Sequence, residues 1–86
     1  MSDPMGFSQF AEHVRAQFDV AADLPLRSET GLYDELGLDS IQAFELLVVI
    51  EVAANLHVPP LELPHIFTVG DAYDYYRSAV DLAARQ

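Results

Sequence analysis

The sequence predicts an all-α protein, a four-helix bundle with three longer helices, one short third helix and a long first loop. Apolar residues recur at helical spacing in three separate segments, and no segment shows the two-residue alternation of a half-buried strand. Prolines and turn-forming residues separate these segments. Because each helix has an apolar stripe to bury and no sheet to cover it, we expect the helices to pack on one another.

The first helix is expected from about residue 5 to residue 22. Asp3 and Pro4 suit its start, since aspartate caps the free N–H groups of a first turn and proline fits the first helical position. The expected buried face follows helical spacing and consists of Phe7, Phe10, Ala11, Val14 and Phe18.

A long loop is expected over residues 23–39, where helical periodicity is absent and turn-forming residues are frequent. Loops of this length are uncommon in compact domains and usually have a function or are held down. The segment "LYDEL" at residues 32–36 is expected to form a short helical turn. Five leucines are expected to hold the loop on the core, namely Leu24, Leu26, Leu32, Leu36 and Leu38.

The second helix is expected to begin at Asp39 or Ser40 and to end at about Asn55. Asp39 at the N-cap and Gln42 at the third helical position have the spacing of a capping box, in which each side chain accepts a hydrogen bond from the other residue's backbone N–H. Ser40 then lies in the first turn of the helix.

Two further helices are expected after residue 56. Three prolines in "HVPPLELPHIF" leave room for only a short third helix, which ends near Phe67. Thr68 and Asp71 have the capping-box spacing at the start of the last helix. The expected buried face of the last helix consists of Val69, Ala72, Tyr73, Tyr76, Val80 and Ala83.

Size and charge limit the classes of function. The 86 residues are expected to form a single domain over residues 1–86, and the 51% hydrophobic content predicts a packed core. Fourteen acidic residues against four arginines give a net charge of −10. This charge repels nucleic acid and anionic lipid, so neither is expected as a partner, whereas basic protein surfaces are attracted.

The residue types that support metal, thiol or membrane chemistry are missing or scattered. The absence of cysteine excludes disulfides and thiolate zinc sites. His13, His57 and His65 lack the spacing of metal ligands, so no metal is expected. The chain begins without a secretory signal, and its longest strongly apolar run, residues 46–50, is too short for a bilayer, so a cytoplasmic location is expected.

The second helix has more apolar residues than its share of a small core requires. Its core stripe is expected to contain Ala43, Leu46, Leu47, Ile50 and Ala54. A second apolar set, interrupted by Gln42, Glu45 and Glu51, lies largely outside that stripe and consists of Ile41, Phe44, Val48, Val49 and Val52. A helix that is apolar nearly all round is either enclosed or has a face for a partner. Because enclosure is difficult in so short a chain, we expect a partner face.

Ser40 lies beside this face and has three interpretations. Serine at a helix start is most often a cap. A nucleophile is disfavoured, because the hydrolase elbow requires glycine where Leu38 and Gln42 stand. In the third interpretation another enzyme modifies Ser40, and a phosphodiester formed there would be stabilised by the free N–H groups and the dipole at the helix N-terminus.

Two segments carry a resemblance to the acyl carrier protein family. The segment "LGLDSI" at residues 36–41 resembles the family's attachment motif, in which the serine of Asp-Ser-Leu or Asp-Ser-Ile receives 4'-phosphopantetheine from coenzyme A. The segment "IFTVGDAYDYY" at residues 66–76 resembles the Thr-Val segment that opens the family's last helix, at the usual distance after the serine. With the first helix and the long loop, the resemblance covers essentially the whole chain.

The resemblance implies a non-catalytic carrier. Ser40 is the implied attachment site of 4'-phosphopantetheine, with Asp39 as its motif neighbour, and a phosphopantetheinyl transferase performs the attachment. The arm's thiol then holds acyl groups as thioesters, which separate enzymes such as a ketosynthase or an acyltransferase process, and the bundle shelters the acyl chain. The implied docking surface on the second helix consists of Ile41, Phe44, Glu45, Val48 and Val52. A monomer is expected.

The pathway and several alternatives stay open at this point. Fatty-acid carriers usually have several acids along the second helix, where this chain has Gln42, Val52 and Ala53, so the chain resembles carriers of polyketide or related secondary pathways. The extent of the chain favours a freestanding carrier. The alternatives are a peptidyl carrier loaded with an amino acid and an acidic helical adaptor without an arm; a serine hydrolase is the least favoured.

Overall fold

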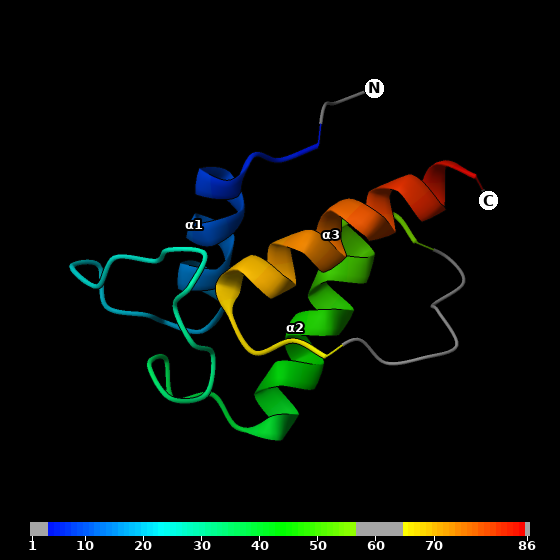
Figure 1. Ribbon diagram of the computed structural model, residues 1–86. Coiled ribbons are helices and arrows are strands. Elements are labelled where there is room, and N and C mark those ends of the chain that lie inside the picture. Colours follow the sequence, from blue (N-terminus) through cyan, green and yellow to red (C-terminus); the bar gives the residue numbers. More distant parts are fainter. Residues whose placement is uncertain (1–3, 57–64, 86) are drawn as a thin grey trace.

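The computed structural model of the protein describes residues 4–56 and 65–85. Within these residues it contains three α-helices, α1 (Phe7–Gln17), α2 (Ser40–Ala53) and α3 (Val69–Ala84), and no β-strand (Figure 1). The predicted all-α fold is confirmed at this level. The predicted short third helix falls mainly on residues 57–64, which lie outside the described residues, and residues 65–67 are not helical.

Helix α3 contacts both of the other helices, α2 and α1 (Figure 1). The long first loop runs from the end of α1 to the start of α2 and passes beside the start of α3. Within the part of the chain that the structure describes, none of the helices is both long enough and apolar enough to cross a membrane.

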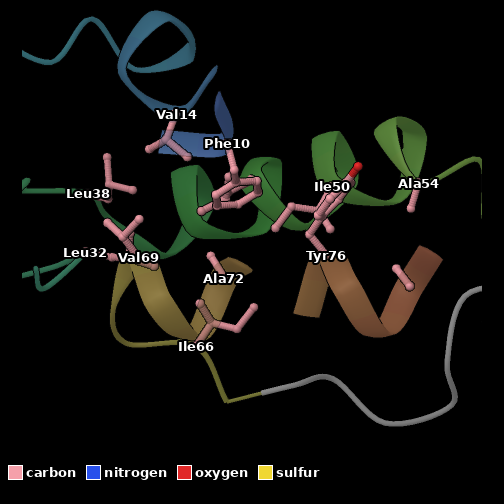
Figure 2. Close-up of a cluster of buried hydrophobic side chains, with 12 residues drawn as sticks. Phe10, Val14, Leu32, Leu38, Ile50, Ala54, Ile66, Val69, Ala72 and Tyr76 are labelled. Carbon is pink, nitrogen blue, oxygen red and sulfur yellow. The ribbon is translucent and has the colours of Figure 1, made fainter. Parts of the chain in front are cut away.

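The hydrophobic core lies where the three helices and the first loop meet (Figure 2). Aromatic rings join α1 to α3, since the ring of Phe10 lies 5.4 Å from that of Tyr73 and 5.7 Å from that of Tyr76. The largest fully buried side chains come from all three helices and the loop, and are Val14, Leu32, Leu46, Ile50 and Val69. The loop is therefore part of the core and not a connection on its surface.

The start of α1 differs from the prediction. The backbone N–H of Met5 donates to the Tyr76 hydroxyl at 3.0 Å, and the Met5 carbonyl accepts from the Tyr73 hydroxyl at 3.0 Å, so this segment binds α3 instead of joining α1. The N-cap is Gly6, without a side-chain cap. The placement of Pro4 in the first turn is therefore wrong, and Asp3 lies outside the described residues.

The end of α1 also differs from the prediction, because the helix stops at Gln17 and not near residue 22. Asp19 has a left-handed backbone with φ of 53°, and the N–H of Val20 donates to the carbonyl of Arg15 at 3.0 Å. This is the six-to-one bond of a Schellman motif, which terminates a helix. Asn55, with φ of 60°, ends α2 in the same way, close to the predicted position.

The leucines of the first loop hold it on the core to different degrees. Leu32 and Leu38 are buried, with 0% and 6% of their surface exposed, and Leu36 and Leu26 are half-buried. Leu24 is exposed, so the prediction is wrong for this residue. The segment at 32–36 forms one turn, in which the N–H groups of Glu35 and Leu36 donate hydrogen bonds to the carbonyl of Gly31.

The start of α3 confirms the second predicted capping box. The Thr68 hydroxyl accepts from the Asp71 N–H at 3.0 Å, and the Asp71 carboxylate accepts from the Thr68 N–H at 3.2 Å. The buried residues of α3 are Val69, Ala72, Tyr76 and Ala79, and the half-buried ones include Tyr73, Val80 and Ala83. The predicted apolar face is therefore the face that packs inward.

Candidate functional site

The N-terminus of α2 places Ser40 at the first helical position, directly after the N-cap residue Asp39. The Asp39 carboxylate accepts a hydrogen bond from the Gln42 backbone N–H at 2.8 Å, and the Gln42 side-chain oxygen accepts one from the Asp39 N–H at 3.1 Å. The predicted capping box is confirmed. Asp39, and not Ser40, caps the helix.

Ser40 is left available for chemistry from outside. Its side chain is exposed, and its hydroxyl forms no hydrogen bond within residues 4–56 and 65–85. The backbone N–H groups of Ser40 and Ile41 also have no hydrogen-bond partner within those residues. Free N–H groups at a helix N-terminus, together with the helix dipole, favour a negatively charged group such as a phosphodiester. The surroundings of Ser40 thus fit a phosphate.

The chain just before Ser40 is fixed by the core and then turns outward. Leu38 is buried, and its N–H donates to the carbonyl of Leu32 at 3.0 Å. Gly37 has φ of 73°, a left-handed conformation that favours glycine, and a Cβ added there would meet no atom within 4 Å. The backbone therefore favours glycine at this position, and the space beside it is open to an approaching enzyme.

The outer face of α2 is apolar and exposed. Its large side chains and their exposed fractions are Ile41 (70%), Phe44 (57%), Val48 (44%) and Val52 (75%). Glu45 is an exposed acid beside them. On the opposite side Leu46, Ile50 and Ala54 are buried, while Ala43 and Leu47 are half-buried. Val49, which the sequence groups with the outward apolar set, is half-buried instead. The predicted surplus of apolar surface is confirmed as an exposed stripe running away from Ser40.

A groove opens on the inner side of this stripe and reaches Ser40. It has a volume of about 300 Å³ and is lined by Tyr33, Ser40, Ala43, Phe44, Leu47, His65, Ile66 and Phe67. The walls come from three parts of the chain that are distant in sequence: the first loop, α2 and the segment before α3. The groove therefore exists only in the folded protein.

A backbone clasp between the first loop and the start of α3 forms two walls of the groove. The N–H of Leu32 donates to the Phe67 carbonyl at 2.8 Å, and the N–H of Val69 donates to the Thr30 carbonyl at 2.9 Å. These bonds flank the isolated antiparallel bridge between Gly31 and Thr68. The clasp brings Tyr33 next to Phe67, with 6.4 Å between their ring centroids.

Three residues of the groove, Tyr33, His65 and Phe67, are not predicted as site residues by the sequence. No local periodicity marks them, because the clasp that gathers them pairs residues more than thirty positions apart. The only available signal is that Tyr33 and Phe67 are large aromatic residues in segments without helical spacing, where a purely structural role is harder to assign. The predicted residues, by contrast, all lie on α2 or at its cap.

Nothing in the described residues activates Ser40 as a nucleophile. His65 lines the same groove as Ser40, but no hydrogen bond joins the two side chains, and His13 is exposed on α1. His57 lies outside the described residues. Among the residues that the structure describes, there is also no group of three metal-binding side chains.

The other end of α2 is tied to α3 by a polar contact. The Tyr75 hydroxyl donates to the Glu51 carboxylate at 2.7 Å. Burial, then the hydrogen bond to Glu51 and its negative charge, raise the pKa of Tyr75 above its ordinary value. Glu51 is therefore engaged within the bundle and does not add a free charge to the exposed stripe.

Comparisons with known proteins identify the class of protein that this geometry defines. Residues 9–85 match the family described as "Phosphopantetheine attachment site". The chain is 35% identical over 60 residues to "Acyl carrier protein, mitochondrial" of Saccharomyces cerevisiae, a match that spans 70% of this chain and 48% of that protein. It is 32% identical over 69 residues to "Acyl carrier protein" of Wolinella succinogenes, spanning 80% of this chain and 90% of that protein. No solved structure matches.

The chain belongs to the phosphopantetheine-attachment family, since the match covers most of its length. The predicted resemblance to acyl carrier proteins is confirmed by the same match and by the two relatives. Members of this family are non-catalytic carriers, and their common feature is a covalently attached 4'-phosphopantetheine. The chain spans about half the length of the yeast relative.

Proposed function

We propose that the protein carries acyl groups as thioesters on a 4'-phosphopantetheine arm attached to Ser40, with Asp39 as the residue that shapes the attachment site. The observation that supports this proposal is the exposed Ser40 hydroxyl at the start of α2. This hydroxyl does not cap the helix, because the Asp39 carboxylate does so. In the attachment reaction the Ser40 oxygen forms a phosphodiester with the phosphopantetheine moiety of coenzyme A. Adenosine 3',5'-bisphosphate leaves, and a base of the transferase takes the hydroxyl proton.

The stripe formed by Ile41, Phe44, Glu45, Val48 and Val52 is the proposed docking surface for the transferase and for acyl-processing enzymes. Its support is the continuity of exposed apolar side chains from Ser40 along α2, since exposed patches of this kind mark interaction sites. Charged residues are few on the stripe, so hydrophobic contact supplies most of the binding energy. Docking is therefore expected to depend only weakly on salt concentration.

The proposed pathway is a polyketide-type or related secondary pathway, with a ketosynthase and an acyltransferase among the partners. The support is the absence of charge on α2 at Gln42, Val52 and Ala53, where fatty-acid carriers usually have acids. The complete fold is proposed to be one four-helix domain with a short third helix, and the protein is proposed to act as a cytoplasmic monomer. A peptidyl carrier would share the same site, and loading assays with an adenylation enzyme or an acyltransferase distinguish the two.

A phosphopantetheinyl transferase assay tests the attachment site. The protein is incubated with coenzyme A, magnesium and a transferase of broad specificity, and its intact mass is measured. We expect one phosphopantetheine on the wild type and none on Ser40→Ala. Ser8→Ala is the matched control, because Ser8 is also exposed in the first turn of a helix and should not affect the addition. A wild type that stays unmodified, or a Ser40→Ala variant that is modified, contradicts the proposal.

A further inference from the structure

Three exposed aromatic side chains surround the groove beside Ser40. Tyr33, Phe44 and Phe67 have 42%, 57% and 60% of their surface exposed, although each is large enough to contribute substantially to a core. They come from the first loop, α2 and the segment before α3. Exposed apolar residues that gather in one concave place mark a binding site more often than scattered ones do.

The aromatic walls are held in place before any ligand arrives. The clasp bond from the Leu32 N–H to the Phe67 carbonyl, at 2.8 Å, fixes the backbone on which Tyr33 and Phe67 stand. The ring of His65 is nearly parallel to that of Phe67, with an angle of 11° and a centroid distance of 6.4 Å. A backbone that is already fixed reduces the conformational entropy lost when a ligand binds.

The occupant with the easiest access to this groove is the cargo of the protein's own arm, and this step rests on the proposed function. Ser40 itself lines the groove, so an acyl group attached through Ser40 is always tethered beside it. A short flexible tether gives an effective concentration in the millimolar range. A groove with only millimolar affinity for the acyl group would therefore be occupied for much of the time.

The size and chemistry of the groove narrow the class of cargo. Its volume of about 300 Å³ is at the small end of ligand pockets, so a long chain would extend beyond it. Aromatic rings interact favourably with other flat rings by offset stacking or edge-to-face contact, in addition to the burial of apolar surface. We infer that the groove binds a flat aromatic or conjugated acyl group of the loaded carrier, with Phe67, Tyr33 and Phe44 as the residues that determine this preference.

Hydrolysis of defined thioesters tests the inference. The arm is loaded in separate samples with benzoyl, cyclohexanecarbonyl and heptanoyl groups, which all contain seven carbons but differ in shape. Loading is verified by intact mass, and each hydrolysis rate is divided by that of the same thioester on free pantetheine, which removes differences in intrinsic reactivity. We expect the protein to slow hydrolysis of the benzoyl thioester roughly 2- to 10-fold more than that of the other two, the range expected from aromatic pairing.

Variants separate the aromatic contribution from simple apolar contact. Phe67→Leu and Tyr33→Leu keep an apolar side chain but remove a ring, and both should remove the preference for benzoyl. Leu82→Ala is the control, because Leu82 is an exposed apolar residue on α3, outside both the groove and the proposed docking surface. Thermal unfolding verifies that all variants are folded.

Four results overturn the inference. Equal protection of the three thioesters, or a benzoyl preference that survives Phe67→Leu, shows that the rings do not select the cargo. NMR spectra give a further test. If the backbone amide signals of Tyr33 and Phe67 shift with protein concentration and not with the identity of the cargo, a second copy of the chain occupies the groove. A failure to attach any arm at Ser40 appears as an unchanged intact mass, and it removes the proposed function as well.

Discussion

Helices α2 and α3 are similar in length, with 14 and 16 residues, and they pack against each other, but they present opposite kinds of surface to the solvent. The outer face of α3 is mostly polar and includes Asp74, Arg77 and Asp81. The outer face of α2 is an apolar stripe. Since both helices contribute fully to the core, the folding of the bundle does not explain the stripe. The difference is the one expected if α2, as proposed, docks a partner in addition to packing in the bundle, whereas α3 only packs in the bundle.

The strongest test of this comparison is a pair of substitutions on the two faces of α2. Ile50 is buried with 1% of its surface exposed, so Ile50→Ala should lower the free energy of unfolding by about 2–5 kcal/mol, through lost burial and a cavity. Val52 is 75% exposed, and Val52→Ala should change the free energy of unfolding by less than about 0.5 kcal/mol. Urea unfolding measures both values. Equal losses would show that the stripe is part of the core.

A second test compares exposed apolar residues on the two helices by their effect on binding. Phe44→Ala should weaken the affinity for a phosphopantetheinyl transferase by more than about 1 kcal/mol, because large aromatic residues are frequent among the residues that dominate binding. Leu82→Ala removes an exposed apolar side chain from α3 and should leave the affinity unchanged. Titration calorimetry with an inactive transferase measures this difference. If Leu82→Ala weakens binding as much as Phe44→Ala does, α2 has no special role.

A third test concerns the N-termini of the two helices. Both begin with a capping box, but the residue after the N-cap is Ser40 in α2 and Val69 in α3. Asp39→Ala and Thr68→Ala should each lower the free energy of unfolding by about 1 kcal/mol, the usual cost of losing a cap. Ser40→Ala should change the free energy of unfolding by less than about 0.5 kcal/mol, because the Ser40 hydroxyl does not cap the helix. Thermal or urea unfolding distinguishes these outcomes. A large loss for Ser40→Ala would mean that the hydroxyl has a structural role.

The smallest expected effect concerns the hydrogen bond from Tyr75 of α3 to Glu51 of α2. The pKa of Tyr75 is raised in the folded protein by burial and by Glu51, so the folded state retains this proton above the ordinary value of about 10. The stabilisation is fully present below pH of about 10 and is lost as the pH rises further. The free energy of unfolding should therefore fall less steeply above that pH in Tyr75→Phe than in the wild type. Identical slopes would contradict the assignment to Tyr75.

The parts of the site that the sequence predicts are those that depend on neighbouring residues. Capping boxes at Asp39 and Thr68 involve bonds between residues three positions apart, so their spacing is visible in the chain. The exposed stripe is visible for the same reason, since it follows the helical repeat. The early end of α1 was missed because Asp19 adopts a left-handed conformation, which residues of its type adopt only in some contexts.

The parts that were missed depend on contacts between distant segments. The clasp between residues 28–32 and 67–70 consists of backbone hydrogen bonds, which leave no characteristic residue type in the sequence. The groove beside Ser40 follows from that clasp, so Tyr33 and Phe67 gain their position from the fold alone. Leu24 was assigned to the core from its type, but the loop around it is exposed. Local patterns therefore single out the proposed attachment residue Ser40, whereas only the folded chain shows what surrounds it.

The central claim is that the hydroxyl of Ser40 is the point where the arm is attached. Tandem mass spectrometry of proteolytic peptides from the protein, isolated from its native host, measures this directly. We predict that phosphopantetheine, with or without an acyl group, is found on the peptide that contains Ser40 and that the modified residue is Ser40 itself. A fully unmodified Ser40 peptide, or an arm located on any other residue, would contradict the account.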